Sequence, residues 1–400
     1  MHRRTGLSTA VSTAVCLAFA SATSAQDRDI PQTPSGHPDL SGTYDVATLT
    51  PVERSEVLGE RVTLTDEAAA ELAKRVRQAR AFSDQPSDPN RGAPPVGGDR
   101  VFGNAFWIEP GQSVTKVDGQ WRTSILIDPP NGRYPPRVAD APTWSGRQRL
   151  QDDGSAYWLE AGPDAPGPFD NMEQRPYAER CLSMGSSAGP PMLPSLANNY
   201  KRIVQSGDTI MILSETVHDA RIIRMNAEHD PPGINKWLGD SIGLWSGDTL
   251  VVETTNFVDR PTFARGTGTM TVTEWFRLES DDALIYTFTV EDPTVWTAPF
   301  SGEYAWARSA NTLFEHACHE GNYPLTAIMK GARVIEAVFR GEAPGGIPRV
   351  APELVHQPQA PRATPAESAE QWPSHGSAPG QASAESAGPR FLEAGRTGRS

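Results

Sequence analysis

The chain has 400 residues and a formal net charge of −13, with 49 acidic against 36 basic residues. No basic cluster stands out, so nucleic acids and anionic membrane surfaces are poor candidates for partners. This length suits one large all-β domain, with or without a small N-terminal appendage.

The first 25 residues have the pattern of a secretory signal. A basic start precedes the apolar run Leu7–Ala20, and small residues follow it. This pattern predicts cleavage after Ala25 or after Ala22. The apolar run is too short to span a bilayer, and no later window approaches a membrane helix. We therefore expect a periplasmic or secreted protein without a membrane span.

Residues 38–100 form a leading segment in which one helix is predicted, over residues 65–81. Thr65 can cap this helix, acidic residues fill its first turn and basic residues crowd its end, in accord with the helix dipole. Its narrow apolar stripe consists of Ala68, Leu72, Val76 and Ala79. This is the pattern of a helix that packs on a larger body.

Residues 101–340 are predicted to form a β-rich body built from hairpins. Three turns of the Gly-Asp or Asp-Asp type each separate two extended runs, which is a strong local signal for a hairpin. The predicted hairpins are Arg202–Val217, Gly243–Phe257 and Met270–Glu291. Residues 342–400 are rich in Pro, Ala, Ser and Gly, and we expect this tail to be disordered.

Three of these strands each place one carboxylate on a largely apolar face, because successive strand side chains alternate between faces. The three faces are Met270, Val272, Glu274, Phe276 and Leu278; Met211, Leu213, Glu215 and Val217; and Val251, Glu253, Thr255 and Phe257. If the strands enclose an interior, such carboxylates are the residues expected to line it.

A carboxylate on an apolar face is costly unless it is paired or hydrogen-bonded. One explanation for Glu215 and Glu274 is an internal ion pair, for which Arg221, Arg224 and Lys201 are candidate partners. The other is a polar cluster in a cavity, where a carboxyl group can serve as acid or base. The sequence favours neither explanation.

Histidines gather in the same region. His218 follows Glu215 by three residues, and His319 lies in the dense run Glu315–Tyr323. An ordinary hydrogen-bonded histidine is the alternative for each. The run lacks the ligand spacing of a zinc site, and phosphate loops and dinucleotide fingerprints are absent from the sequence, so we expect neither a metal nor a cofactor.

Beyond the predicted signal the chain has two cysteines, Cys181 and Cys318. In an oxidising compartment, two thiols far apart in sequence pair more often than they remain free, so we predict a disulfide. Two buried, inert thiols are the alternative.

Longer motifs resemble those of an uncharacterised family of exported bacterial proteins. They are Asp39–Gly42, Ser124–Arg133, Arg180–Leu182, Gly239–Phe257, Phe288–Pro293 and Ala317–Tyr323, and the resemblance covers residues 38–333. It implies no activity that we can name and carries over no catalytic residue. Lipocalin-like barrels are similar to the hairpin series at the level of pattern only.

We predict an all-β fold, an antiparallel meander that forms a calycin-like or lipocalin-like barrel around a cavity, with an N-terminal helical appendage. A two-sheet sandwich is the alternative. Short connections and runs of strand length are the basis of this prediction.

Two classes of function fit such a fold, because fold alone does not choose between them. The first is an exported enzyme that transforms a small, partly apolar molecule by acid–base chemistry, such as hydration, dehydration, isomerisation or hydrolysis. Its candidate catalytic residues are Glu215, Glu274, His218 and His319, and its candidate ligand-binding residues are Arg221, Glu253, Tyr286, Glu320 and Asn322. The second is a non-catalytic ligand-binding barrel or a structural envelope protein. The sequence does not specify the oligomeric state.

Overall fold

The computed structural model describes residues 30–83, 108–141, 169–175, 177–184, 187–259, 263, 266–339 and 342. The predicted signal and the predicted tail beyond residue 342 lie outside the described residues. No helix within the described ranges is long and apolar enough to cross a membrane.

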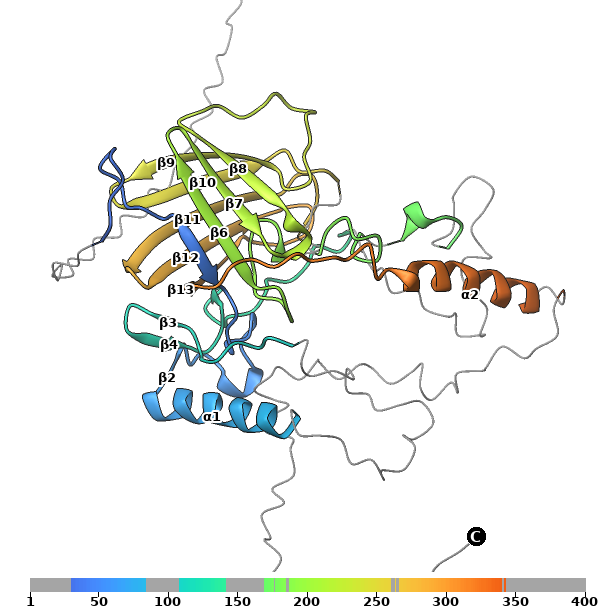
Figure 1. The fold of residues 1–400 in the computed structure, drawn as a ribbon, viewed down its shortest axis with the longest axis horizontal. Helices are drawn as coiled ribbons and strands as arrows, with labels where there is room; N and C mark the ends of the chain where they lie inside the picture. Colours follow the sequence, from blue (N-terminus) through green and yellow to red (C-terminus); the bar gives the residue numbers. More distant parts are fainter. Residues whose placement is uncertain are drawn as a thin grey trace, which may run out of the picture.

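A closed β-barrel forms the centre of the molecule (Figure 1). Within the described part of the chain, the barrel consists of nine strands. It is closed because β1 pairs with β6 on one side and with β13 on the other. The strands are β1 (Gly42–Asp45), β6 (Tyr200–Ser206), β7 (Thr209–Ser214), β8 (Ala220–Met225), β9 (Asp240–Ser246), β10 (Thr249–Thr255), β11 (Thr271–Ser280), β12 (Ala283–Glu291) and β13 (Phe300–Ser309). A further strand, β5 (Leu126–Asp128), pairs with the start of β13. The fold is therefore a barrel and not a sandwich.

All three predicted hairpins are present. β6 and β7 join around Gly207-Asp208, β9 and β10 around Gly247-Asp248, and β11 and β12 around Asp281-Asp282. The turn residues located the hairpins correctly, although β7 ends at Ser214 and does not continue to Val217.

One junction contradicts the predicted antiparallel meander. β8 and β9 run parallel, with Ile223 opposite Ser241 and Met225 opposite Gly243. Residues 226–239 carry the chain back between these two strands. Gly243 allows the close approach, because a Cβ atom there would lie 2.8 Å from Ile223 Cγ2. The barrel is therefore mixed.

Large side chains from alternate strand positions fill the barrel. On β11 and β12, the buried inward residues are Val272, Glu274, Phe276, Leu278, Leu284, Tyr286, Phe288 and Val290. Tyr304 and Trp306 of β13 join them in an aromatic cluster, in which the ring centroids of Tyr286 and Trp306 are 4.8 Å apart. Glu274 thus lies inside the core, as alternation along its strand predicted.

The face predicted for Glu215 is wrong. The buried residues of β7 are Ile210, Ile212 and Ser214. Met211 and Leu213 lie on the other face, and Glu215 comes after the strand, at the start of the helical turn η6 (Thr216–His218). The turn therefore buries Glu215, because side chains alternate only within extended backbone.

A smaller unit lies beside one end of the barrel (Figure 1). Its helix α1 (Asp66–Ser83) confirms the predicted helix, and Thr65 Oγ1 accepts a hydrogen bond from Ala68 N at 3.2 Å. The helix buries Ala69 and Ala73, and the predicted Leu72 and Val76 pack against this cluster, whereas the predicted Ala68 and Ala79 are exposed. The neighbouring small sheet contains β2 (Thr63–Leu64), β4 (Gln120–Arg122) and β3 (Lys116–Val117).

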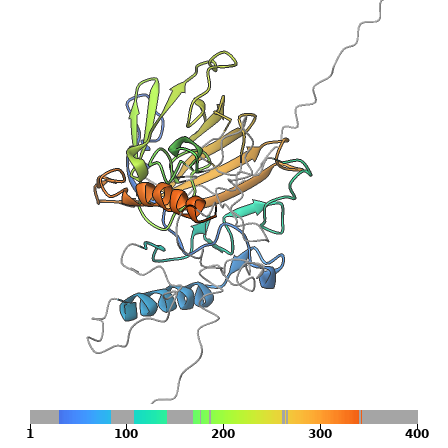
Figure 2. The same cartoon turned by 90° about the vertical axis from the view of Figure 1, so that its right-hand side faces the viewer.

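A second helix, α2 (Tyr323–Phe339), has no counterpart in the prediction. It projects to one side of the barrel in Figure 1 and lies in front of the barrel in Figure 2, where that side faces the viewer. Arg333 Nη2 donates a hydrogen bond to Phe169 O at 2.5 Å, close to the short helix η4 (Met172–Gln174). A third short helix, η1 (Glu56–Leu58), precedes β2.

Candidate functional site

An ion pair crosses the barrel interior between β8 and β11. Arg221 Nη1 donates to Glu274 Oε1 at 3.0 Å, and Arg221 Nη2 donates to Glu274 Oε2. Arg221 Nε also donates to Ser241 Oγ at 2.9 Å, and Nη2 donates to Thr254 Oγ1 at 2.8 Å. The side chains of Arg221 and Glu274 are 2% and 0% exposed. The guanidinium group is therefore held by partners on three neighbouring strands.

Tyr286 completes the coordination of Glu274. Its hydroxyl donates to Glu274 Oε1 at 2.7 Å and accepts a hydrogen bond from Met192 N at 3.0 Å. Tyr304 donates to Met192 O at 2.9 Å. Burial, together with the nearby Glu274 carboxylate, raises the pKa of Tyr286 well above 10.0. The structure thus brings three predicted site residues together, Glu274, Arg221 and Tyr286, in a network whose hydrogen bonds are mutually satisfied.

A pocket of about 420 Å³ opens in the barrel wall beside this network. One side is formed by Asp219–Ile222 and Arg224, and the other by Lys236–Ser241. The first residues of β8 have no partner on β9, because the pairing begins only at Ile223. We call the pocket between these two segments the wall pocket. It exists because the parallel junction leaves β8 and the chain entering β9 apart at this end.

Asp219 is the residue of the wall pocket whose bonding is incomplete. Its Oδ2 is buried and has no hydrogen-bond partner among the described residues. Burial raises the pKa of Asp219 to about 6, against the lowering effects of His218 and Lys201. Asp219 is not among the site residues predicted from the sequence. The available signal was its spacing, since Asp219 precedes Arg221 by two positions and extended residues at that spacing share a face.

We expect the free energy of unfolding to depend on pH through the protonation of Asp219. The folded protein retains this proton up to about pH 6, whereas an ordinary aspartate loses it near 3.8. The folded state therefore binds more protons across that interval, so the contribution of Asp219 to the free energy of unfolding falls as the pH rises through it. Asp219→Asn should remove this slope.

Urea unfolding of the wild type and of Asp219→Asn across this pH range checks the prediction. The stability difference in favour of the asparagine variant should grow with pH and then level off above about 6. Parallel curves for the two proteins would contradict it, and Asp248→Asn, at an exposed hairpin turn, serves as the control.

Lys201 and Glu215 are two further buried charged groups near the pocket, and Lys201 interacts electrostatically with both Glu215 and Asp219. Lys201 of β6 is fully buried and donates to Ser187 O. Burial lowers the pKa of Lys201 to about 7, opposed by the carboxylates of Glu215 and Asp219. Glu215 accepts hydrogen bonds from Phe314 N at 3.1 Å and Tyr200 N at 3.4 Å. Its carboxylate therefore joins three backbone segments.

A charge cluster borders the opposite side of the wall pocket, around the buried Asp240. Its carboxylate is bonded by Arg224 at 2.9 Å, Lys236 at 2.5 Å and His229 at 3.0 Å. Burial alone would raise the pKa of Asp240, but these partners and the Asp230 amide hold it well below 3.8. His229 also contacts Glu253, which is 53% exposed on the outer surface and outside the pocket lining.

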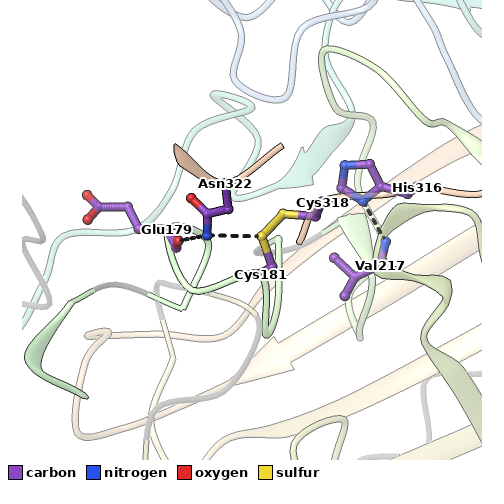
Figure 3. Close-up of a disulfide and its surroundings, with 6 residues drawn as sticks. All are labelled: Glu179, Cys181, Val217, His316, Cys318 and Asn322. Atoms are coloured by element: carbon purple, nitrogen blue, oxygen red, sulfur yellow. Dashed lines mark hydrogen bonds between the residues drawn. A yellow bond between two sulfur atoms is a disulfide. The ribbon is translucent and has the colours of Figure 1, made fainter. Parts of the chain in front are cut away.

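The remaining predicted site residues lie away from the pocket lining. His218 is exposed in the η6 turn, and His319 and Glu320 are exposed in the turn before α2. Asn322 Nδ2 donates to Glu179 O at 2.8 Å and contacts Cys181 Sγ at 3.5 Å (Figure 3). The described residues contain no group of three or more side chains placed to hold a metal ion.

The predicted disulfide is present. Cys181 and Cys318 are bonded, with their Cα atoms 5.7 Å apart and a sequence separation of 137 (Figure 3). It joins the segment before β6 to the segment after β13.

The chain matches no protein-family model, and no curated protein matches it.

Proposed function

We propose that this protein binds a small, partly apolar, uncharged molecule in the wall pocket, through a hydroxyl or N–H group that donates to Asp219. The observation that carries the proposal is that Asp219 lines the pocket and that its buried Oδ2 lacks a partner among the described residues. Buried polar atoms are almost always hydrogen-bonded, so an unpaired acceptor in a pocket calls for a donor.

The rest of the pocket lining supports this ligand class. Ile222 and Trp237 are 49% and 46% exposed beside Asp219 and offer apolar contact surface. The cations of the lining are already engaged, Arg221 by Glu274 and Arg224 and Lys236 by Asp240. An anionic ligand would compete with those carboxylates, and a cationic one would approach three cations. A neutral ligand avoids both costs.

Acid–base chemistry at Asp219 is the second candidate function. A carboxyl group that titrates near pH 6 can exchange a proton with a bound molecule, and catalytic groups work best when they titrate near the operating pH. Lys201, with a pKa of about 7, is a buried group that can influence that proton. On this alternative the pocket would serve hydration, isomerisation or hydrolysis of the same ligand class.

The place of action we propose is the periplasm or the exterior of a bacterium. The Cys181–Cys318 bond supports an oxidising compartment, because disulfides persist there and are rare in reducing cytosol. We also propose membership of the exported bacterial family that the motifs resemble. The longest of these motifs, Gly239–Phe257, begins with three residues that line the wall pocket, Gly239, Asp240 and Ser241.

Titration with a pair of matched probes tests the binding proposal. Naphthol is a neutral aromatic alcohol, and naphthalene has the same rings without the hydroxyl. Wild-type protein should bind naphthol more tightly, and Asp219→Ala should weaken naphthol binding roughly tenfold or more, as for loss of a hydrogen bond to a charged group. Binding of naphthalene should change little in that variant, because it makes no such bond.

Two further variants locate the binding. Trp237→Ala should weaken both probes, and Asp248→Ala, an exposed turn residue outside the pocket, should affect neither. Equal affinity of the wild type for the two probes, or unchanged naphthol binding in Asp219→Ala, would reject the proposal. Mass spectrometry of ligands that co-purify with the exported protein, followed by turnover tests on that class, would separate binding from catalysis.

A further inference from the structure

The turn that presents Asp219 to the wall pocket has an unfavourable backbone conformation. Val217 has φ 56° and His218 has φ 46°, and neither is glycine. A positive φ is particularly costly for a β-branched residue such as valine, and such conformations persist only when surrounding contacts impose them. The turn therefore needs an external support.

Residues 314–318, which we call the strap, supply that support. Val217 N donates to His316 Nδ1 at 3.0 Å (Figure 3), and Phe314 N donates to Glu215 Oε1 at 3.1 Å. The strap thus bonds the turn once through the strained residue and once through the buried carboxylate before it. Both bonds run between segments about 99 positions apart in the chain.

The disulfide connects the strap to the opposite side of the pocket. Cys318 ends the strap, and Cys181 lies in a turn closed by the hydrogen bond from Leu182 N to Tyr177 O at 2.9 Å. The Tyr177 ring meets Trp237 edge-on, with centroids 4.8 Å apart. Trp237 lines the side of the pocket that faces Asp219. One series of contacts therefore runs from one pocket wall to the other.

We propose that the strap and the Cys181–Cys318 disulfide act as a clamp that sets the positions of both walls of the pocket. His316 is the positioning residue for Asp219, and Tyr177 transmits the disulfide restraint to Trp237. The inference rests on the proposed function for its binding consequences. The mechanical part, in which non-covalent contacts on either side of one disulfide restrain the two walls, does not depend on a ligand.

The role of His316 requires an acceptor at Nδ1. A neutral imidazole with its proton on the other nitrogen accepts the Val217 amide, whereas a doubly protonated ring cannot accept. An asparagine side chain can place its amide oxygen near the position of Nδ1, so His316→Asn should preserve the bond and His316→Ala should abolish it. His319, exposed and three residues further on, is the matched control.

Hydrogen exchange of the unliganded full chain tests the clamp. In His316→Ala, exchange in residues 214–222 should become roughly tenfold faster, as expected when a local opening becomes easier. In Cys181→Ser/Cys318→Ser, exchange should rise in residues 214–222 and also in residues 236–241. His316→Asn and His319→Ala should behave as the wild type. The β11–β12 hairpin reports global stability and should be unchanged in the histidine variants.

The outcomes separate the clamp from the binding proposal. Wild-type exchange rates in His316→Ala, or an equal acceleration in β11–β12, would overturn the clamp. If the clamp holds and the protein also binds naphthol, His316→Ala should weaken naphthol binding about tenfold while His316→Asn retains it. If the wild type binds neither probe, the proposed function fails, and the exchange results still decide the clamp.

Discussion

Replacing Arg221 with methionine should lower the free energy of unfolding by about 3–5 kcal/mol. The Glu274 carboxylate is fully buried and would lose both guanidinium hydrogen bonds, keeping only the Tyr286 hydroxyl. Leaving a buried charge without its partner destabilises a protein by several kcal/mol, whereas the net stabilisation by an intact buried pair is much smaller. Urea unfolding of the variant at neutral pH measures the loss.

A double-mutant cycle distinguishes this stranded charge from simple loss of packing. Arg221→Met/Glu274→Met should recover a large part of the loss, because the second change removes the unpaired carboxylate. Arg75→Met is the control, since Arg75 pairs with Glu71 on the exposed face of α1 and such pairs contribute less than about 1 kcal/mol. Additive effects of the two core substitutions would contradict the expectation.

The same pair decides between the two explanations of Glu274. In the ion-pair explanation, Glu274→Gln destabilises the protein because it leaves Arg221 buried without an anion. In the catalytic explanation, Glu274→Gln leaves stability unchanged and abolishes turnover of the ligand. The bidentate contact and the closed network around it favour the first outcome.

Removal of the disulfide should have the second large effect. Cys181→Ser/Cys318→Ser should lower the free energy of unfolding by about 2–5 kcal/mol, because the bond closes a long loop and restricts the unfolded chain. The sequence separation of 137 residues places it among the long loops for which the chain-entropy model gives the largest values. Unfolding of the oxidised protein and of the double-serine variant measures the difference.

Thiol counting provides the control for that measurement. Denatured, unreduced wild-type protein without its signal should show no free thiol, and reduction should release two, Cys181 and Cys318. Reduced wild type should then unfold at the same urea concentration as the double-serine variant. Two free thiols before reduction, or equal stability of the oxidised protein and the variant, would contradict the prediction.

Local patterns were sufficient for the parts of the fold that depend on neighbouring residues. The turn dipeptides located three hairpins, the terminal charges located α1, and alternation along β11 placed Glu274 inside. Each of these features arises within one turn, one helix or one strand, where residues a few positions apart interact directly. Alternation misplaced Glu215 because the strand ended one residue earlier and a turn followed.

Nothing in the sequence by itself indicated that β8 and β9 would run parallel, or that α2 would follow the last strand. Parallel pairing depends on the path of residues 226–239 around the barrel, and a short apolar run cannot be assigned to a strand or to a helix by its periodicity alone. The wall pocket follows from that parallel junction, and it selected Asp219 over the residues predicted from alternation.

The sequence alone thus determined the hairpins, the inward carboxylate of β11 and the pairing of its two cysteines. Only the tertiary structure decided which cation meets Glu274, because Arg221 on β8 reaches it across β9 and β10. It also decided which carboxylate stays unpaired, since a missing partner is a property of every segment packed around Asp219 and not of its neighbours in the chain.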